Sequence, residues 1–356
     1  MTLIPPETLR SAVQAGILNE AQAVRLSVHL QTEFGFRAAL SGDDEPFEFF
    51  RGFSEIFVTL GLSLLWGGAL GLIGLSVSWM FAHFCCLALC LGLARYFTLI
   101  RRMSLPSIAL ALGAAVNGSA VFSIGFFELG SFEKAPLMAL AALGMGGMAL
   151  YFKVFKLPFA MFLFGLFAML LSYSVALDLT DISLAPANFP EMFFNLGIGA
   201  PVAYASLGLG FAMMALGLWF DMQDPHRLGR FSATGFWLHI LAAPALVNTA
   251  AFSLYKLGGT TGYLSMAGLL LLVTVFALII DRRSFLTAGL FYFIAVIVWI
   301  TNQALGEAFG GVSIVFILGV LFTALGTWWV QMRGAVLRAL PEFPGKSKLP
   351  PYRSED

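Results

Sequence analysis

Long runs without a formal charge dominate the chain between Ile56 and Met332. Charged side chains occur there in small clusters, and the neutral runs that separate them include 103–127, 157–177, 231–255, 257–280, 284–306 and 308–332. Each run reaches the ~20 residues that a helix needs to cross ~30 Å of hydrocarbon. The runs do not alternate between polar and apolar residues, as the strands of a membrane β-barrel do. The pattern therefore predicts membrane-spanning helices, in which the backbone groups are satisfied within each segment.

The first neutral run extends from Ile56 to Ala94 and is about twice as long as one span requires. We expect it to form two spans with a turn near Ser76–Trp79. The whole pattern then predicts ten spans, at 56–76, 78–97, 105–127, 136–152, 157–177, 194–219, 231–254, 261–280, 284–303 and 310–330.

The distribution of Lys and Arg predicts the orientation, because basic residues are enriched in cytoplasmic loops. With the N-terminus in the cytoplasm, the basic clusters at 95–102, 153–156, 227–230 and 282–283 all fall on the cytoplasmic side. Only Lys134 and Lys256 then face outward. An even number of spans places the C-terminus in the cytoplasm as well.

Composition supports the same class of protein. The chain is 59% hydrophobic and 11% charged, with a mean hydropathy of +0.87, which is too few charges to cover a soluble protein of 356 residues. We predict an all-α polytopic integral membrane protein with the lipid bilayer as its main partner and no nucleic acid. Residues 1–55 hold no apolar segment behind a basic start, so the first span is expected to act as its own insertion signal.

The segment before the first span is expected to be a small cytoplasmic unit. Residues 1–50 predict a helical hairpin and an acidic linker, in which Pro6 starts the first helix, Gly16 stops it and Asn19 caps the second. Such a hairpin is too small to be stable alone, so residues 6–31 are expected to contact the membrane domain, a second copy of the chain or another protein. Residues 51–332 form the predicted ten-helix domain, and 333–356 are predicted to be a disordered cytoplasmic tail.

Three stretches resemble one known family. They are AVQAGILNEAQAVRL, FRGFSEIFVTLGLSLL and RYFTLIRRMSLPSIAL. Over about 15–110 the chain resembles the predicted bacterial membrane proteins grouped as domain-of-unknown-function family 2157. The resemblance implies a multi-pass protein of the bacterial inner membrane with a short helical hairpin before its spans. It implies no activity and no catalytic residues.

One stretch, FAHFCCLALC at 81–90, suggests metal or redox chemistry because it holds all three cysteines and His83. His83 and Cys86 share a helix face and are the candidate metal ligands, with Cys90 on the same face. His83 and Cys90 are ~10.5 Å apart along the helix axis, too far to meet on one ion. A closed zinc site also needs four ligands. We therefore expect packing and no cofactor, with a hydrogen-bond partner for His83 from Cys86 or a neighbouring helix.

Polar residues inside spans are candidates for function by default. Asn117, His239 and Asn248 are the deepest and define a candidate polar path. Backbone breaks are a second signal, because interrupted helices line the substrate sites of many carriers. The helix-break candidates are Gly197, Gly199, Pro201 and Pro244.

These features leave three hypotheses for function. The first is a membrane protein without enzymatic activity, whose hairpin serves self-association or docking. The second is a carrier or flippase for a neutral or amphipathic solute, with a path near Asn117, His239 and Asn248. The third is a metal or redox protein built on His83 and Cys86. The sequence contains no P-loop, nucleophile elbow, HExxH motif or dinucleotide fingerprint, so nothing in it indicates an enzyme.

Overall fold

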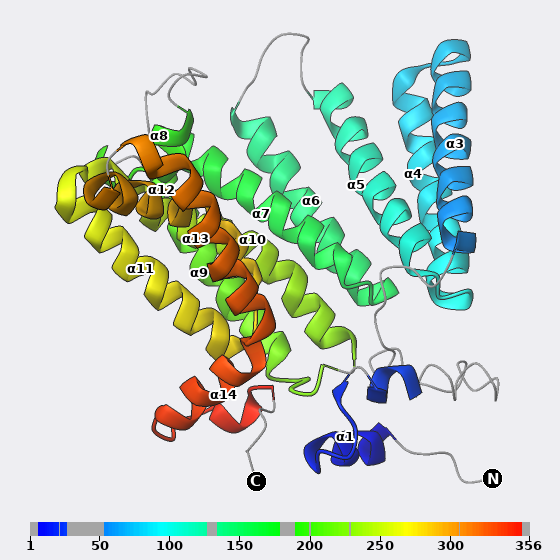
Figure 1. Cartoon of the computed structure of the whole chain (residues 1–356). Helices are drawn as coiled ribbons and strands as arrows, with labels where there is room; N and C mark the ends of the chain where they lie inside the picture. The colour runs from blue at the N-terminus through cyan, green and yellow to red at the C-terminus, as the bar shows by residue number, and fades with distance from the viewer. Residues whose placement is uncertain are drawn as a thin grey trace.

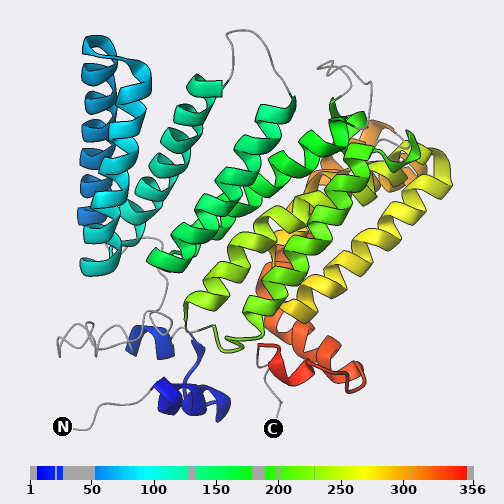
Figure 2. The same ribbon diagram turned by 180° about the vertical axis from the view of Figure 1, so that it is seen from behind.

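The structure is a computed structural model that describes residues 6–20, 22–26, 53–126, 134–178, 189–198, 201–227, 229–305 and 307–350. All regular structure in these ranges is helical (Figures 1 and 2). The long helices are α3 (Phe53–Ser76), α4 (Trp79–Ala94), α5 (Ser104–Phe126), α6 (Lys134–Phe155), α7 (Phe159–Asp178), α9 (Pro201–Asp221), α10 (Arg230–Leu257), α11 (Gly259–Ile280), α12 (Ser284–Leu305) and α13 (Glu307–Thr327). The short elements are α1 (Pro6–Gln14), α8 (Phe189–Phe194), α14 (Trp329–Ala339), the π-helix η2 (Arg95–Ile100) and the 3₁₀ turns η4 (Leu196–Ile198) and η5 (Lys346–Lys348).

Eight of the described helices are long and apolar enough to cross a membrane, namely α3, α4 with η2, α5, α6, α7, α9, α10 and α11. A further pair, Phe316–Thr327 of α13 and α14 (Trp329–Ala339), meets the same test together but bends by 72° at its break. The all-helical, multi-pass membrane architecture is therefore confirmed. The exact count of ten spans stays a prediction.

The expected turn after the first span lies where α3 and α4 meet. Helix α3 ends at Ser76 and α4 begins at Trp79. The Ser78 hydroxyl caps α4 by accepting a hydrogen bond from the Phe81 N–H at 3.2 Å. At the other end of α3, the buried Glu55 carboxylate accepts from the Leu105 N–H at 3.2 Å and so caps α5.

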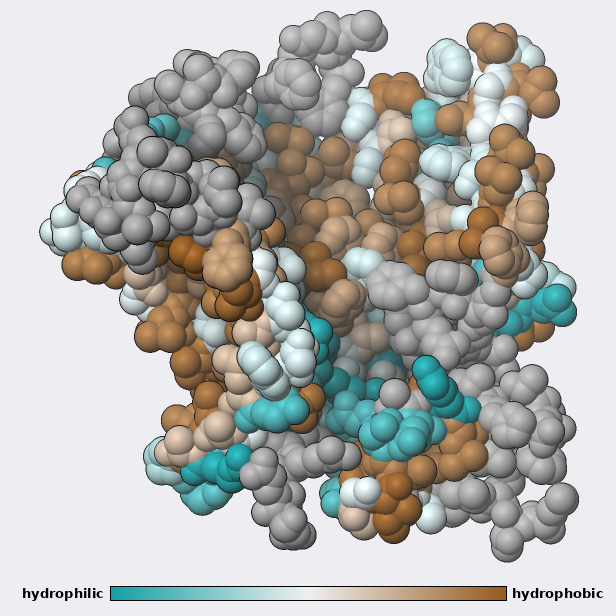
Figure 3. Space-filling model, in the orientation of Figure 1, coloured by the Kyte–Doolittle hydropathy of each residue, from teal (hydrophilic) through white to brown (hydrophobic). Residues whose placement is uncertain are grey.

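Helices α1 and α14 lie at the same end of the bundle, which we call the hairpin end (Figure 1). Hydrophilic residues gather toward this end in the space-filling view, whereas the sides of the bundle are largely hydrophobic (Figure 3). Exposed apolar side chains on these sides include Leu64 at 69%, Leu72 at 75% and Leu271 at 67%. Such an apolar surface is expected when lipid is the solvent.

The N-terminal unit begins with α1 at Pro6, and Gly16 follows it with a φ of +69°. Asn19 and Gln22 then form a reciprocal cap: the Gln22 N–H donates to Asn19 Oδ1 at 2.8 Å, and the Asn19 N–H donates to Gln22 Oε1 at 3.0 Å. The acidic linker and residues 27–31 of the predicted hairpin lie outside the described residues.

Two predicted boundaries need correction. The span predicted at 194–219 is the helix Pro201–Asp221, with α8 and η4 before it. Pro201 starts this helix because proline fits the first turn, where its missing N–H costs no hydrogen bond.

The predicted disordered tail, 333–356, is the second correction. Its first part lies in α14, where Trp329, Arg333 and Leu337 are all buried at helical spacing. The chain then continues as far as Pro350, whose carbonyl oxygen accepts a hydrogen bond from Arg333. An amphipathic face that can pack against the bundle explains the order. Residues 351–356 lie outside the described residues.

Candidate functional site

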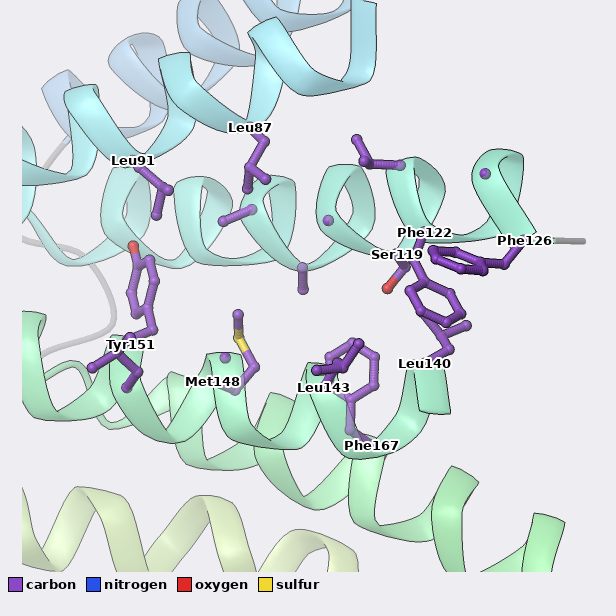
Figure 4. Close-up of a pocket in the computed structure, with 18 of the residues that line it drawn as sticks. Leu87, Leu91, Ser119, Phe122, Phe126, Leu140, Leu143, Met148, Tyr151 and Phe167 are labelled. Carbon is purple, nitrogen blue, oxygen red and sulfur yellow. The ribbon is translucent and has the colours of Figure 1, made fainter. Parts of the chain in front are cut away.

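A groove of about 700 Å³ lies between helices α4 and α5 on one side and α6 and α7 on the other (Figure 4). We call it the lateral groove. Its lining side chains are all apolar except for the hydroxyls of Ser119 and Tyr151. Its volume lies within the range of about 300–1,000 Å³ that ligand pockets in proteins span.

The lateral groove opens at the side of the bundle. Three lining residues, Phe126, Leu143 and Leu150, are 67%, 64% and 62% exposed. Lining residues extend along α6 from Leu140 to Phe155, which corresponds to about 22 Å of helix. The groove therefore faces the region that lipid tails occupy and runs along more than half of a ~30 Å hydrocarbon core.

Packing at the hairpin end explains how the groove forms. There α4, α5, α6 and α7 share one buried cluster that includes Cys90, Ala111, Tyr151 and Phe159. Toward the other end, α5 and α6 diverge (Figures 1 and 2). Small residues keep the space open, because a Cβ added at Gly118 or Gly147 would meet no atom within 4 Å.

A network of buried charges forms a second notable site, at the hairpin end of α9 and α10. Asp221 Oδ2 accepts from His239 Nε2 and from Arg282 Nε, each at 3.0 Å, and Arg282 Nη2 also bonds Asp221 Oδ1. Arg282 Nη2 further donates to the Ser232 carbonyl at 2.8 Å. The network joins α9, α10 and the α11–α12 turn, and the Asp221–Arg282 pair balances its charge.

A parallel ion pair connects the same two loops. Arg227, in the α9–α10 loop, donates to Asp281 Oδ2 at 2.9 Å, and Trp329 Nε1 of α14 donates to Asp281 Oδ1 at 2.6 Å. Asp281 thus pairs with Arg227, and its neighbour Arg282 pairs with Asp221. This geometry holds α9, α10, α11 and α14 together at the hairpin end.

The sequence reasoning missed this network. Asp221 falls just beyond the predicted end of its span at 219, and Arg282 was interpreted only as an orientation signal. The one available signal was the presence of opposite charges in both loops, at 221–230 and at 281–283.

The candidate polar residues are placed in separate contacts. Asn117 is fully buried on α5, where its Oδ1 accepts from His83 Nδ1 at 2.9 Å and its Nδ2 donates to the Gly113 carbonyl at 2.7 Å. His239 is fully buried and bonded to Asp221, and its Nδ1 has no partner. Asn248 is half-buried on α10, and its carbonyl accepts from Tyr292 at 3.4 Å. The structure thus joins Asn117 with His83 and does not bring Asn117, His239 and Asn248 together, and none of the three lines the lateral groove.

The helix-break candidates behave differently from one another. Gly197 lies in η4, and Pro201 begins α9. Gly199 lies outside the described residues. Helix α10 continues through Pro244, which therefore does not interrupt it.

His83 and Cys86 make separate polar contacts. His83 bonds Asn117, so its partner comes from a neighbouring helix, while Cys86 Sγ lies 3.8 Å from the Trp66 carbonyl oxygen. Within the described ranges, no three His, Cys, Asp or Glu side chains are grouped closely enough to hold a metal ion. These contacts connect α4 to α5 and α3, which is a packing role.

Comparison with protein-family models, curated proteins and solved structures finds no match for this chain. The resemblance to family 2157 therefore stays an expectation. The fold and its apolar surface define the class: an α-helical, multi-pass membrane protein with a groove in its lipid-facing side.

Proposed function

We propose that this protein binds an amphipathic, lipid-like solute, whose apolar part lies in the lateral groove, and that it acts as a carrier or flippase for that solute. The observation that carries the proposal is the groove itself, because its walls are apolar and it opens toward lipid. The path of the solute is then the space between α5 and α6 rather than the neighbourhood of Asn117, His239 and Asn248.

The occupant we propose is one acyl chain. A chain in one leaflet spans half of the ~30 Å hydrocarbon core, and the groove is long enough to hold it. The lining residues carry no charge, so they suit the neutral part of a molecule. Aromatic side chains offer broad surfaces for contact with such a chain: Phe122 and Phe126 lie toward the end away from the hairpin, and Phe167 lies beside Leu143 (Figure 4).

The topology that we propose has ten spans and both termini in the cytoplasm of a bacterium, with the domain in the inner membrane. Its support is the placement of charges. The basic residues Arg95, Lys156, Arg227 and Arg282 all lie at or near helix ends on the same side as α1 and α14. Lys256 lies at the opposite end, where it pairs with Glu191. This asymmetry is the one that cytoplasmic loops show.

A second role, docking by the N-terminal unit, is also supported by electrostatic interactions between this unit and the bundle. Glu20 interacts electrostatically with Arg227 and Asp281, and Arg10 with His226. The first surface that the unit meets is thus the hairpin end of its own bundle. We propose that residues 6–31 dock there, and that any second copy or partner protein would have to compete with this contact.

A substitution that fills the groove tests the proposal. The protein, in nanodiscs of known lipid composition, is irradiated with a phospholipid that carries a photoactivatable group midway along one acyl chain. Gly147→Leu places a side chain in the open groove. Gly146→Leu is the matched control, because Gly146 is also exposed and has open space around it but does not line the groove. Both changes gain the same helix propensity, about 1 kcal/mol.

We expect labelling of peptides from α5 and α6 to fall at least about fivefold in Gly147→Leu, since filling a formed site costs on the order of 1–3 kcal/mol. Labelling of Gly146→Leu should equal that of the wild type. Equal labelling of all three proteins would show that the groove does not bind the chain.

A further inference from the structure

One lining residue of the lateral groove carries an unused polar group. Tyr151 is 3% exposed, and its hydroxyl has no hydrogen-bond partner. Figure 4 shows this hydroxyl directed away from α6, toward Leu91. Buried hydroxyls almost always have a partner, so this one calls for an explanation.

A second unused hydroxyl lies beside the first. Thr98 is 6% exposed, and its hydroxyl likewise has no partner at hydrogen-bond distance and angle. The two hydroxyls are near enough to interact electrostatically with each other. Thr98 belongs to η2, the π-helical turn that follows α4. π-Helical turns are rare and frequently occur at functional sites. Tyr151 lines the groove near its hairpin end, and Thr98 lies beside Tyr151 without lining the groove itself.

The position of these hydroxyls along the membrane indicates the kind of group they would bind. Tyr151 lies four residues before the end of α6 at Phe155, which is about 6 Å from the helix end. This depth is where the hydrocarbon core gives way to the interfacial layer, and where the linkage between an acyl chain and its headgroup is located. A carbonyl oxygen there has two lone pairs and can accept from both hydroxyls.

We propose that the Tyr151 and Thr98 hydroxyls form a polar subsite that binds the ester carbonyl of an acyl lipid whose chain lies in the lateral groove. The inference rests on the proposed function and extends it to a chemical class of ligand: ester-linked rather than ether-linked lipids. It also fixes the orientation of the ligand, with the headgroup toward the hairpin end and the chain toward Phe122.

Two lipid probes that differ only in linkage test the inference. Both carry the same photoactivatable chain, one through an ester and the other through an ether, and both are incorporated with the full-length protein in nanodiscs. The wild type should label with the ester probe about tenfold more than with the ether probe, which is the size expected of two ordinary hydrogen bonds. Tyr151→Phe and Thr98→Val should each lower this preference, and the double variant should abolish it while leaving the ether labelling unchanged.

Tyr204→Phe is the matched control, because Tyr204 is exposed on α9, away from the groove. Its ester preference should equal that of the wild type. Thermal unfolding without probe lipid gives an independent readout. Since both hydroxyls are unpartnered, Tyr151→Phe and Thr98→Val should unfold at or above the wild-type temperature, and a clear loss of stability would mean that the two hydroxyls bond each other instead.

The outcomes separate this inference from the proposed function. An ester preference that persists in the double variant, or a wild type without any preference, would overturn the polar subsite. Either result leaves the proposed function intact as long as Gly147→Leu lowers labelling by both probes. If Gly147→Leu labels like Gly146→Leu, the groove is not a binding site and both proposals fail.

Discussion

Asp221 joins three parts of the chain at the hairpin end of the bundle. Its two carboxylate oxygens accept from His239 and Arg282, which come from two other parts of the chain. A buried charge is tolerated only when it is paired and hydrogen-bonded. Removal of one partner leaves the other charge uncompensated, which is more costly than the loss of the pair.

We therefore predict that Asp221→Asn destabilises the protein by about 3–5 kcal/mol, because Arg282 is left buried without its counter-charge. Thermal unfolding in detergent would measure the change. Gln223→Ala, an exposed position two residues along, should have little effect. The double variant Asp221→Asn/Arg282→Gln should recover part of the loss, and a double variant as unstable as the sum of both single changes would argue against direct coupling.

Gly235 supplies the space that Asp221 occupies. A Cβ at this position would overlap the Asp221 carboxylate and come within 2.9 Å of the Gly217 carbonyl oxygen. Gly235→Ala should cost about 1–3 kcal/mol by the same unfolding measurement, in spite of the better helix propensity of alanine. Gly208→Ala on α9 meets no atom within 4 Å and should be neutral or slightly stabilising. Equal stability of the two variants would contradict the packing described here.

At the residue scale, the sequence identified the right polar groups but not their partners. His83 and Asn117 were each noted as polar groups in lipid, and their contact across α4 and α5 could not be read from positions 34 residues apart. Asp221 and Arg282, 61 residues apart, are a stronger example. Pairing of this kind depends on which helices become neighbours, and that information is absent from apolar periodicity.

At the scale of elements, the N-terminal unit is the part whose contact depends on charge. Burial raises the pKa of Glu20 above its usual 4.5, while Arg227 opposes the shift. The other charged groups that act on Glu20 are Asp281, Arg333 and Asp224. A raised pKa in the docked state means that the protonated carboxyl favours docking. The contribution is fully present below 4.5 and is lost as the pH rises through the raised pKa.

Docking of the N-terminal unit should consequently weaken as the pH rises from about 4.5 toward neutrality. Hydrogen exchange of residues 6–26 would be measured in the wild type and in Glu20→Gln at each pH. The ratio of the two exchange rates removes the intrinsic pH dependence of exchange. The two proteins should exchange alike near pH 4.5, and the wild type should exchange faster at higher pH. A constant ratio across this range would show that Glu20 does not control the contact.

The spanning helices were predictable because the membrane sets a requirement on each segment that can be checked along the sequence alone. A segment that crosses lipid must be long, apolar and internally hydrogen-bonded, and α3 to α7 and α9 to α11 follow from this rule. Helix α14 and the π-helix η2 were not predicted. Helix α14 depends on a face that packs against the bundle through Trp329 and Leu337. The π-helix η2 depends on a backbone hydrogen-bond pattern that no residue type predicts.

At the scale of the whole molecule, the central feature is the separation of α5 from α6. Helices α4 to α7 share one buried cluster at the hairpin end, and α5 and α6 diverge beyond it (Figure 2). The sequence shows a run of mostly small residues in α6, at 142–150, but not which of them pack against a neighbour. Gly144 does pack, since a Cβ there would overlap the Phe167 ring, whereas Gly147 faces open space in the groove. Only the assembled bundle distinguishes the two.

The most direct test of the proposed function is an experimental structure of the protein in a lipid nanodisc, determined by electron cryo-microscopy without added ligand. The account predicts an elongated, chain-like density between α5 and α6, extending from Phe122 to Tyr151, with Gly147 against it. In Gly147→Leu the same density should be absent or displaced. Close packing of α5 on α6 along their whole length, with no space between them, would contradict the account.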